Sequence, residues 1–414
     1  MEMYMGRSQD QKINIKEIIG NLSHEDLVGS NGISKNGLIG LVENILQEIM
    51  GKEKKEFLCD SVSDKSNGSY SRSLNTSLGK LSIDVPRVRS GGFRSSLLPE
   101  KYQRYDESFE ELIFTFLVNG DSKNEIVYKM KQRGISFSEK AYDEIFEYIK
   151  TQMENFKSCE LDNEYNFIYI DAYHCMVKDS KTTKVKKGVI YTVLGIDKEA
   201  NKSILGFYSF FGHENKSTWM EVFQNLINRG LKRVLMFISD DFSGMSEAIN
   251  TLFPLSDIQK CIVHLDRNLY RNMHRDDARA VTKKLYEIKT TCDTLDEGLA
   301  IYENDVINKF KQKYPTFINH LNKRKNEHLA FLKYPEATRK HIYTTNPVES
   351  VHSSFEKMRI KKGGFFQSMD TLNVAIFIVC DKLNLTWKKP IPMIKSKIYE
   401  LNQLFNLKFY EQEV

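Results

Sequence analysis

The stretch NFIYIDAYHCMV, from Asn166 to Val177, decides the fold, together with two runs that follow it. These are KKGVIYTVLGI at Lys186–Ile196 and KSILGFYSFF at Lys202–Phe211. All three are rich in Ile, Val, Tyr and Phe, which favour strands, and short polar connections separate them. Because connections this short join antiparallel neighbours, the sequence predicts an antiparallel meander.

The next 50 or so residues alternate between helical and strand patterns. NKSTWMEVFQNLINRG predicts an amphipathic helix that ends at Gly230, and RVLMFISDDF predicts a buried strand. SGMSEAINTLF then predicts a helix and DIQKCIVHL a further strand. The predicted fold class is therefore α/β, with three antiparallel strands and then two crossover strands in one mixed sheet. This order matches the ribonuclease-H-like fold, in which the first and fourth strands are neighbours.

The remaining sequence predicts helices around this core. Residues 266–340 are Lys-rich and show no strand pattern, so we expect an all-helical insertion, after which LNVAIFIVCDKL (Leu372–Leu383) gives another apolar helix. The expected organisation is an N-terminal helical region at 1–62, a DNA-binding region at 63–155, the catalytic core at 160–265, the insertion at 266–340, the second part of the core at 341–385, and a C-terminal helical tail at 386–414.

Before the core, Leu38–Met50 has helical apolar spacing and fits either a dimerisation helix or ordinary core. The polar stretch SVSDKSNGSYSRS suggests a linker and a domain boundary, and alternation of Leu81, Ile83 and Val85 predicts a hairpin. Two helices with capping boxes, Ser122 with Glu125 and Ser136 with Glu139, suggest a helix-turn-helix. That signal is weak, because many helical hairpins never touch DNA.

Composition narrows the class of protein. The chain has 414 residues, a formal charge of +5 and 41% hydrophobic residues, enough for more than one core. Its six cysteines form no Cys-x-x-Cys pair, which argues against a zinc ribbon or a disulfide framework. No run is long and apolar enough for a membrane span, and the amino terminus lacks a secretory signal. We expect a cytoplasmic protein without a membrane partner.

Acidic residues follow the predicted sheet. Asp171 lies inside the first strand, Asp240 and Asp241 follow the fourth, and Glu349 lies in TTNPVES after the insertion. Clustered carboxylates repel one another, and a divalent cation such as Mg²⁺ resolves the repulsion. Two ions about 3.5–4 Å apart would activate water or a 3'-hydroxyl and stabilise the leaving oxygen of a phosphodiester. No covalent protein–DNA intermediate is then needed.

Each carboxylate also has a purely structural interpretation. Asn346 suits a helix N-cap and Pro347 the first helical position, so Glu349 falls where a capping-box glutamate reaches back to the cap. A strand aspartate such as Asp171 often bonds to neighbouring backbone, and Asp240 fits an ordinary turn. A helix start also favours a negative charge, so Glu349 is able to cap and to bind metal.

Longer motifs give a resemblance. NGSYSRSLNTSLGKLSIDVPRVRSGGF, YIDAYHCMVKD, STWMEVFQNLINRGL, VLMFISDDFSGMSEAI, FPLSDIQKCIVHLDRN and YTTNPVESVHSSF occur in order between about Asn67 and Phe366. In these motifs the sequence resembles the bacterial Mutator-type insertion-sequence transposases. The resemblance implies an Asp, Asp, Glu triad of Asp171, Asp240 and Glu349 that binds two Mg²⁺ ions, with Mn²⁺ as a substitute. It also makes Cys261 and His264 the family's Cys-x-x-His element, with His264 beside the scissile region.

Two features depart from the family pattern. Asp240-Asp241 stands where the family usually has Asp-Gly, so Asp241 is a second candidate at that position. The insertion has no tryptophan, since the only two are Trp219 and Trp387, and an indole that stacks on a flipped base is not available there. A tyrosine or phenylalanine could substitute.

The resemblance implies a DNA transposase that cleaves the terminal repeats of its element and joins them to target DNA. Partners would be double-stranded DNA and a second copy of the chain or more, at the bacterial nucleoid. Basic clusters near the proposed site would hold phosphates, although Lys-rich loops are often merely solvated. The candidate DNA-binding residues are Arg87, Arg89, Lys140, Tyr142, Lys187, Arg267, Asn268, Arg271, Lys357, Arg359, Lys361 and Lys362.

Two other functions compete with this one. A domesticated DNA-binding protein with the same fold would not cut, and the intact triad speaks against it. A metal-dependent phosphohydrolase for small molecules would leave the basic clusters and the amino-terminal hairpin without a purpose. Nicking of supercoiled DNA with Mg²⁺ separates the first from a transposase, and salt-insensitive activity on a nucleotide would support the second.

Overall fold

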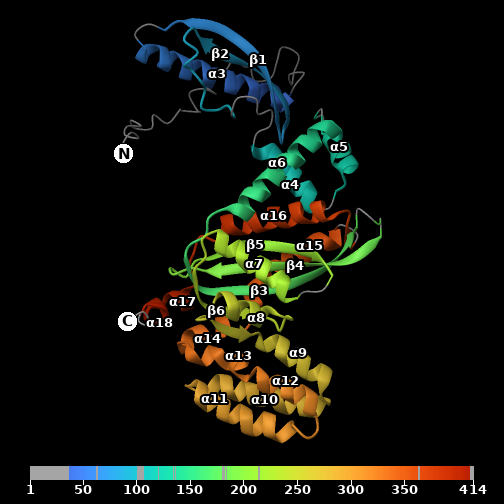
Figure 1. Cartoon of the computed structure of the whole chain (residues 1–414). Helices are drawn as coiled ribbons and strands as arrows, with labels where there is room; N and C mark the ends of the chain where they lie inside the picture. Colours follow the sequence, from blue (N-terminus) through green and yellow to red (C-terminus); the bar gives the residue numbers. More distant parts are fainter. Residues whose placement is uncertain are drawn as a thin grey trace. The chain divides into compact units, whose positions relative to one another are not determined.

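The computed structural model describes residues 37–61, 64–99, 107–119, 121–133, 135, 137–179, 182, 184–212, 215–361 and 364–410. The chain forms two compact units, drawn in Figure 1. Unit 1 comprises Met1–Leu117 and Asp121–Phe146, and unit 2 comprises Val118–Gly120 and Glu147–Val414.

The hairpin predicted in unit 1 is present. Strands β1 (Ser66–Thr76) and β2 (Gly79–Val88) pair antiparallel, and Leu81, Ile83 and Val85 are buried on one face, as their alternation predicts. Helix α3 (Gly37–Asp60) covers this face with Val42, Leu46 and Met50. Apolar side chains within Leu38–Met50 therefore pack into an intramolecular core, as the core alternative predicts.

The linker prediction is wrong for most of SVSDKSNGSYSRS. Strand β1 begins at Ser66 and runs through this polar stretch. Its side chains up to Ser71 are exposed, so this half of the strand is held by the ladder of backbone hydrogen bonds to β2, and apolar burial begins only at Leu74. Such a strand cannot be predicted from the spacing of hydrophobic residues, because most of its side chains are polar.

Unit 1 continues with helices α4 (Glu107–Asn119), α5 (Lys123–Gln132) and the start of α6 (Glu139–Ser158). The capping box of α5 is confirmed: the Ser122 amide donates to Glu125 Oε2 at 2.7 Å, and the Glu125 amide donates to Ser122 Oγ at 3.4 Å. The second predicted box falls on Ser136, outside the described residues.

Unit 2 is built on one mixed sheet. Its strands β3 (Glu164–Lys178), β4 (Val185–Ile196), β5 (Lys202–Phe211), β6 (Arg233–Ser239) and β7 (Asp257–Lys260) have the order β5-β4-β3-β6-β7. The β3-β4-β5 meander is antiparallel, and β6 and β7 add in parallel beside β3. The predicted adjacency of the first and fourth strands is confirmed. A two-residue strand, β8 (Phe365–Phe366), pairs with β3 and was not predicted.

Helices cover both faces of this sheet (Figure 1). On one face, Ile168, Ile170 and Tyr191 pack against helices α7 (Lys216–Asn228) and α8 (Met245–Leu252), around the buried Trp219. Because strand side chains alternate between faces, Asp171 and its cross-strand partner Thr192 point to the other face. Helices α15 (Asn346–Lys361) and α16 (Met369–Thr386) pack there.

The strand predicted for DIQKCIVHL is only half correct. Strand β7 ends at Lys260, and helix α9 (Ile262–Asn272) begins two residues later, after Cys261. Ile262, Leu265 and Leu269 of this helix are all buried. Their spacing is helical, so the apolar stripe that continues beyond the quoted run decides against a longer strand.

The rest of unit 2 is helical, as predicted. Figure 1 shows the helices from α9 to α14 gathered in one block, and the fully described stretch from Ile262 to Lys361 contains no strand. The helices that follow α9 are α10 (Arg275–Thr291), α11 (Leu295–Tyr302), a π-helix (Glu303–Asn308), α12 (Pro315–Lys323), α13 (Lys325–Leu329), a 3-10 turn (Ala330–Lys333) and α14 (Glu336–Ile342). Helices α17 (Pro392–Lys395) and α18 (Ile398–Phe409) end the chain. A search of the described helices found none with the length and apolarity to cross a membrane.

Candidate active site

The sheet register brings two predicted carboxylates together. Ile170 of β3 pairs with Ser239 of the parallel strand β6. Asp171 and Asp240 are the next residue after each of these, so they stand at the same level on neighbouring strands. The prediction that both arrive at one edge of the sheet therefore agrees with the register.

Asp171 is 5% exposed and needs partners for its charge. The Ala172 amide donates to Asp171 Oδ1 at 2.9 Å, and His352 Nδ1 lies 3.4 Å from Oδ2. The local backbone contact matches the structural interpretation of a strand aspartate. The histidine contact comes from α15, which is remote in sequence, so Asp171 also belongs to a tertiary cluster.

Asp240 lies beside His264 of α9. Its Oδ2 is 3.9 Å from His264 Nδ1, and its Oδ1 accepts the Asp241 amide at 2.7 Å. Burial lowers the pKa of His264, but contacts with Cys261 and Asp240 outweigh burial and raise this pKa to about 9. Arg267 Nη1 lies 2.9 Å from Nε2, and since a guanidinium only donates, this contact opposes a second ring proton. The contact with Arg267 favours a single ring proton on Nδ1, which lies 3.9 Å from Asp240 Oδ2, beyond hydrogen-bond distance.

Glu349 joins the group through Arg267. The Arg267 Nη2 to Glu349 Oε1 distance is 3.5 Å, so this guanidinium bridges His264 and Glu349. Helix α15 begins at Asn346, one position before the predicted first helical residue, and the Glu349 amide donates to the Thr345 carbonyl. The predicted cap position therefore lies inside the helix, and the Glu349 carboxylate faces Arg267.

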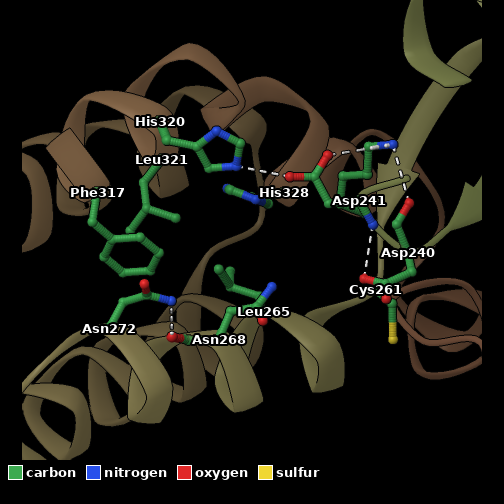
Figure 2. A pocket seen from close by; sticks show the side chains of 11 residues that line it. Asp240, Asp241, Cys261, Leu265, Asn268, Asn272, Phe317, His320, Leu321 and His328 are labelled. Carbon is green, nitrogen blue, oxygen red and sulfur yellow. Dashed lines mark hydrogen bonds and ion pairs between the residues drawn. The ribbon is translucent and has the colours of Figure 1, made fainter. Parts of the chain in front are cut away.

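Asp241 points away from this group into the helical insertion, as Figure 2 shows. His320 Nε2 lies 2.7 Å from its Oδ2, Arg324 Nε lies 3.0 Å from Oδ1, and the buried amine of Lys260 lies 4.0 Å from Oδ1. These partners come from α12, the α12–α13 junction and β7. Asp241 thus links the sheet to the insertion, whereas Asp240 lies beside His264.

A pocket of about 250 Å³ lies between Asp240 and Asp241 on one side and the insertion on the other (Figure 2). The backbone turn beside it depends on Gly244, which has a φ of +77°. A Cβ at this position would lie 2.4 Å from the Lys216 amide nitrogen. Glycine is therefore required where the chain leaves Asp240 and Asp241 and enters α8.

The carboxylates suit a metal by their chemistry. Asp171, Asp240 and Glu349 offer only oxygen ligands, which Mg²⁺ prefers. In the part of the chain that the structure describes, no three His, Cys, Asp or Glu side chains gather closely enough to hold a metal ion. Each carboxylate instead contacts a basic or imidazole side chain, namely His352, His264 or Arg267.

The predicted DNA-binding residues of unit 1 differ in exposure. Arg87 and Arg89 are exposed at the end of β2, and the Arg87 guanidinium lies 4.8 Å from the Tyr70 ring centroid. Lys140 is exposed at the start of α6. Tyr142 is half-buried and stacks on Phe146 at 5.8 Å, and burial raises its pKa to about 12. Tyr142 therefore contributes packing within its own helix.

In unit 2 the predicted DNA-binding residues fall on three elements. Lys187 is exposed on β4, Lys357 is exposed on α15, and Arg267, Asn268 and Arg271 share α9. Arg359 is engaged within the protein, because it pairs with Glu356 and Nη1 donates to the Gly364 carbonyl at 3.2 Å. Lys361 is the last residue of α15, and the structure does not describe its side chain. Lys362 lies outside the described residues.

Two residues that contact the predicted acidic residues were not predicted from the sequence. His352 lies one turn after Glu349 on α15, and i,i+3 spacing in a predicted helix is the signal that places it near the same edge. Arg324 lies in the insertion, and nothing in the local sequence connects it with Asp241.

Comparison with known proteins gives one consistent result. A family model described as "Transposase, Mutator family" matches residues 10–390. The chain is 28% identical over 323 residues to the transposase for insertion sequence element IS905 of Lactococcus lactis, covering 78% of this chain and 81% of that protein. It is 25% identical over 386 residues to the transposase for element ISRM3 of Rhizobium meliloti, covering 92% and 95%.

Proposed function

Because this chain belongs to the Mutator family of transposases, we propose that it is a DDE-type enzyme that binds the terminal repeats of its mobile element. It cleaves DNA strands there in a metal-dependent reaction and transfers them to target DNA. The relatives named above are transposases for insertion sequence elements, which supports DNA as the substrate. The mixed sheet would be a ribonuclease-H-like core, and its strand order supports that assignment.

One observation carries the proposal. The β3–β6 register sets Asp171 and Asp240 side by side, and α15 brings Glu349 into contact with Arg267, which also contacts the His264 beside Asp240. Three acidic residues that are remote in sequence are thus linked through shared neighbours, which supports a common site for them. Since two of them lie beside each other, their mutual repulsion favours a divalent cation.

Asp171, Asp240 and Glu349 would hold Mg²⁺, with Mn²⁺ as its substitute and two ions per site. When bound, the ions would activate the attacking oxygen and neutralise charge on the scissile phosphate. His264 Nδ1 lies 3.9 Å from Asp240 Oδ2, so its ring would lie beside this carboxylate and the scissile phosphate. Arg267 is half exposed, which leaves its planar guanidinium available to a backbone phosphate. No side chain needs to form a covalent bond to DNA.

DNA would be held by exposed basic side chains. Arg267 and Arg271 lie on α9, which also carries His264, and Lys357 lies on α15 with Glu349. The hairpin arginines of unit 1, Arg87 and Arg89, would contact the element ends. Two ends must be brought together for joining, so we propose a homodimer or larger assembly on DNA.

The test is strand cleavage of a labelled element end by the full-length protein with Mg²⁺ or Mn²⁺. We expect Asp171→Asn, Asp240→Asn and Glu349→Gln to lose cutting by several hundredfold or more, the scale of an essential electrostatic group. These changes keep the side-chain shape. Asp241→Asn is the matched control and should keep substantial cutting, because its side chain faces the insertion.

Other outcomes would point elsewhere. Retention of cutting by all three acidic variants would refute the triad. Specific binding of element ends by a wild-type protein that neither nicks nor joins would identify the domesticated, non-cutting alternative. Equal loss of cutting in Asp241→Asn and Asp240→Asn would show that position 241 shares the chemistry.

A further inference from the structure

We propose that His352 is a positioning residue that fixes the Asp171 carboxylate for metal binding, and that Thr192 fixes His352 in turn. The inference rests on the proposed function, in which Asp171 is a metal ligand. It assigns a role to a histidine and a threonine that the predicted triad does not contain.

The contact between His352 and Asp171 has a defined direction. A carboxylate in the ionised form only accepts hydrogen bonds, so the His352 nitrogen 3.4 Å from Asp171 Oδ2 must carry hydrogen to be attractive. This nitrogen is Nδ1. The Ala172 amide occupies Oδ1 at 2.9 Å, so each oxygen has one protein partner. Each carboxylate oxygen has two lone pairs, and one on each remains for another ligand.

Thr192 sets the orientation of the imidazole. Its Oγ1 lies 3.1 Å from His352 Nε2, and the hydroxyl is able to donate to this nitrogen. Thr192 is fully buried and is the direct cross-strand partner of Asp171 in the β3–β4 ladder. Asp171 and Thr192 are thus neighbours across the two strands, and His352 of α15 contacts both of them.

Packing removes the remaining freedom of the ring. His352 is 9% exposed, and its ring centroid lies 5.7 Å from that of Tyr173 and 5.6 Å from that of Phe355. Tyr173 is itself fixed, because its hydroxyl donates to Glu356 at 2.7 Å. A ring held by two aromatic neighbours and one hydroxyl presents Nδ1 in a constant position.

A residue that orients a metal-binding carboxylate affects metal affinity more than folding. Loss of such a partner typically lowers metal affinity or activity about 10- to 100-fold. The same chain offers variants that separate orientation from packing. Phenylalanine at 352 keeps the flat ring between Tyr173 and Phe355 and removes both nitrogens. Asparagine keeps a donor at the position of Nδ1 and loses the ring.

The experiment titrates the full-length protein with Mn²⁺ and measures free Mn²⁺ by its paramagnetic resonance signal. We expect His352→Phe to weaken Mn²⁺ binding about tenfold or more, and Thr192→Val to weaken it by a smaller factor. His352→Asn should bind within about threefold of wild type. Thr338→Val is the matched control, since Thr338 is fully buried and its hydroxyl donates to the Pro335 carbonyl at the start of α14.

A second readout is the Mg²⁺ concentration that gives half-maximal cutting, which should rise in parallel with the Mn²⁺ dissociation constant. Melting curves report folding separately. Equal Mn²⁺ affinity in wild type and His352→Phe would overturn the positioning role. Equal weakening in the Phe and Asn variants would also overturn it, because a donor at the position of Nδ1 would then not restore Mn²⁺ binding. If wild type cuts DNA and Asp171→Asn loses Mn²⁺ affinity while His352→Phe does not, this inference alone is refuted, whereas a wild-type protein that neither binds Mn²⁺ nor cuts refutes both proposals.

Discussion

Asp240 and Asp241 are neighbours in sequence with different contact partners, so truncation of each one should separate stability from chemistry. Asp241→Ala removes the partner of His320 and Arg324 and weakens the attachment of the insertion to the sheet. Asp240→Ala removes a carboxylate whose ion-pair partner is His264 at 3.9 Å. We expect the first variant to lose stability and the second to lose cutting.

The size of the stability loss follows from exposure. Arg324 and Asp241 are 19% and 20% exposed, so their pair at 3.0 Å is mostly buried and its loss costs about 2 kcal/mol, below the full value for a buried pair. His320 is 49% exposed and its pair adds about 0.5 kcal/mol. Lys260 keeps Glu327 at 3.9 Å and the Asp240 carbonyl at 3.2 Å. The total is about 2.5 kcal/mol, against less than about 1 kcal/mol for Asp240→Ala.

The assay is urea unfolding followed by tryptophan fluorescence. Trp219 lies in the core of unit 2, with its ring centroid 5.5 Å from that of Phe242, the residue after Asp241. Its emission therefore reports unfolding beside the turn. Arg324→Gln, alone and combined with Asp241→Ala, completes a double-mutant cycle. If the pair is real, the double variant loses less stability than the sum of the single losses.

Two results would refute this reasoning. The first is a stability of Asp241→Ala within about 0.5 kcal/mol of wild type, the range of an ordinary surface substitution. The second is strict additivity of the Asp241 and Arg324 changes, which would mean that the two side chains do not interact in solution. Loss of cutting in fully folded Asp241→Ala would separately contradict the assignment of its side chain to the insertion.

Three further predictions concern the core, pH and DNA. Trp219→Ala should cost about 4 kcal/mol of unfolding free energy in urea, because the indole is fully buried and lies 4.5 Å from the ring centroid of Tyr191. Burial lowers the pKa of His328 to about 3 from an ordinary 6.5, so the unfolded state takes up its proton first as pH falls. Stability should therefore drop below about pH 6.5, by about 1.4 kcal/mol per pH unit from this group, and unfolding curves of His328→Phe should lack that component. Arg87→Ala should weaken binding to element ends and reduce the slope of log affinity against log salt by about 1, measured by fluorescence anisotropy.

Regular patterns determined most of the fold. The strands β3, β4 and β5 follow β-branched and aromatic runs, and their short links leave no alternative to antiparallel pairing. Helix α7 follows its apolar spacing and ends before Gly230. Local composition failed where exposed polar residues form a strand, as in the first half of β1, and where a strand pattern gives way to a helix after Cys261.

The candidate site divides in the same way. The sequence by itself determined which acidic residues stand at strand ends and at a helix start, because strand period and turn chemistry are local properties. Only the tertiary structure decided the partners of those residues: His352 for Asp171, Arg267 for Glu349, and Arg324 for Asp241. Each of these pairs joins elements that meet only after the sheet and the insertion have packed. Contacts between residues remote in sequence depend on packing of the whole unit, and no local pattern encodes them.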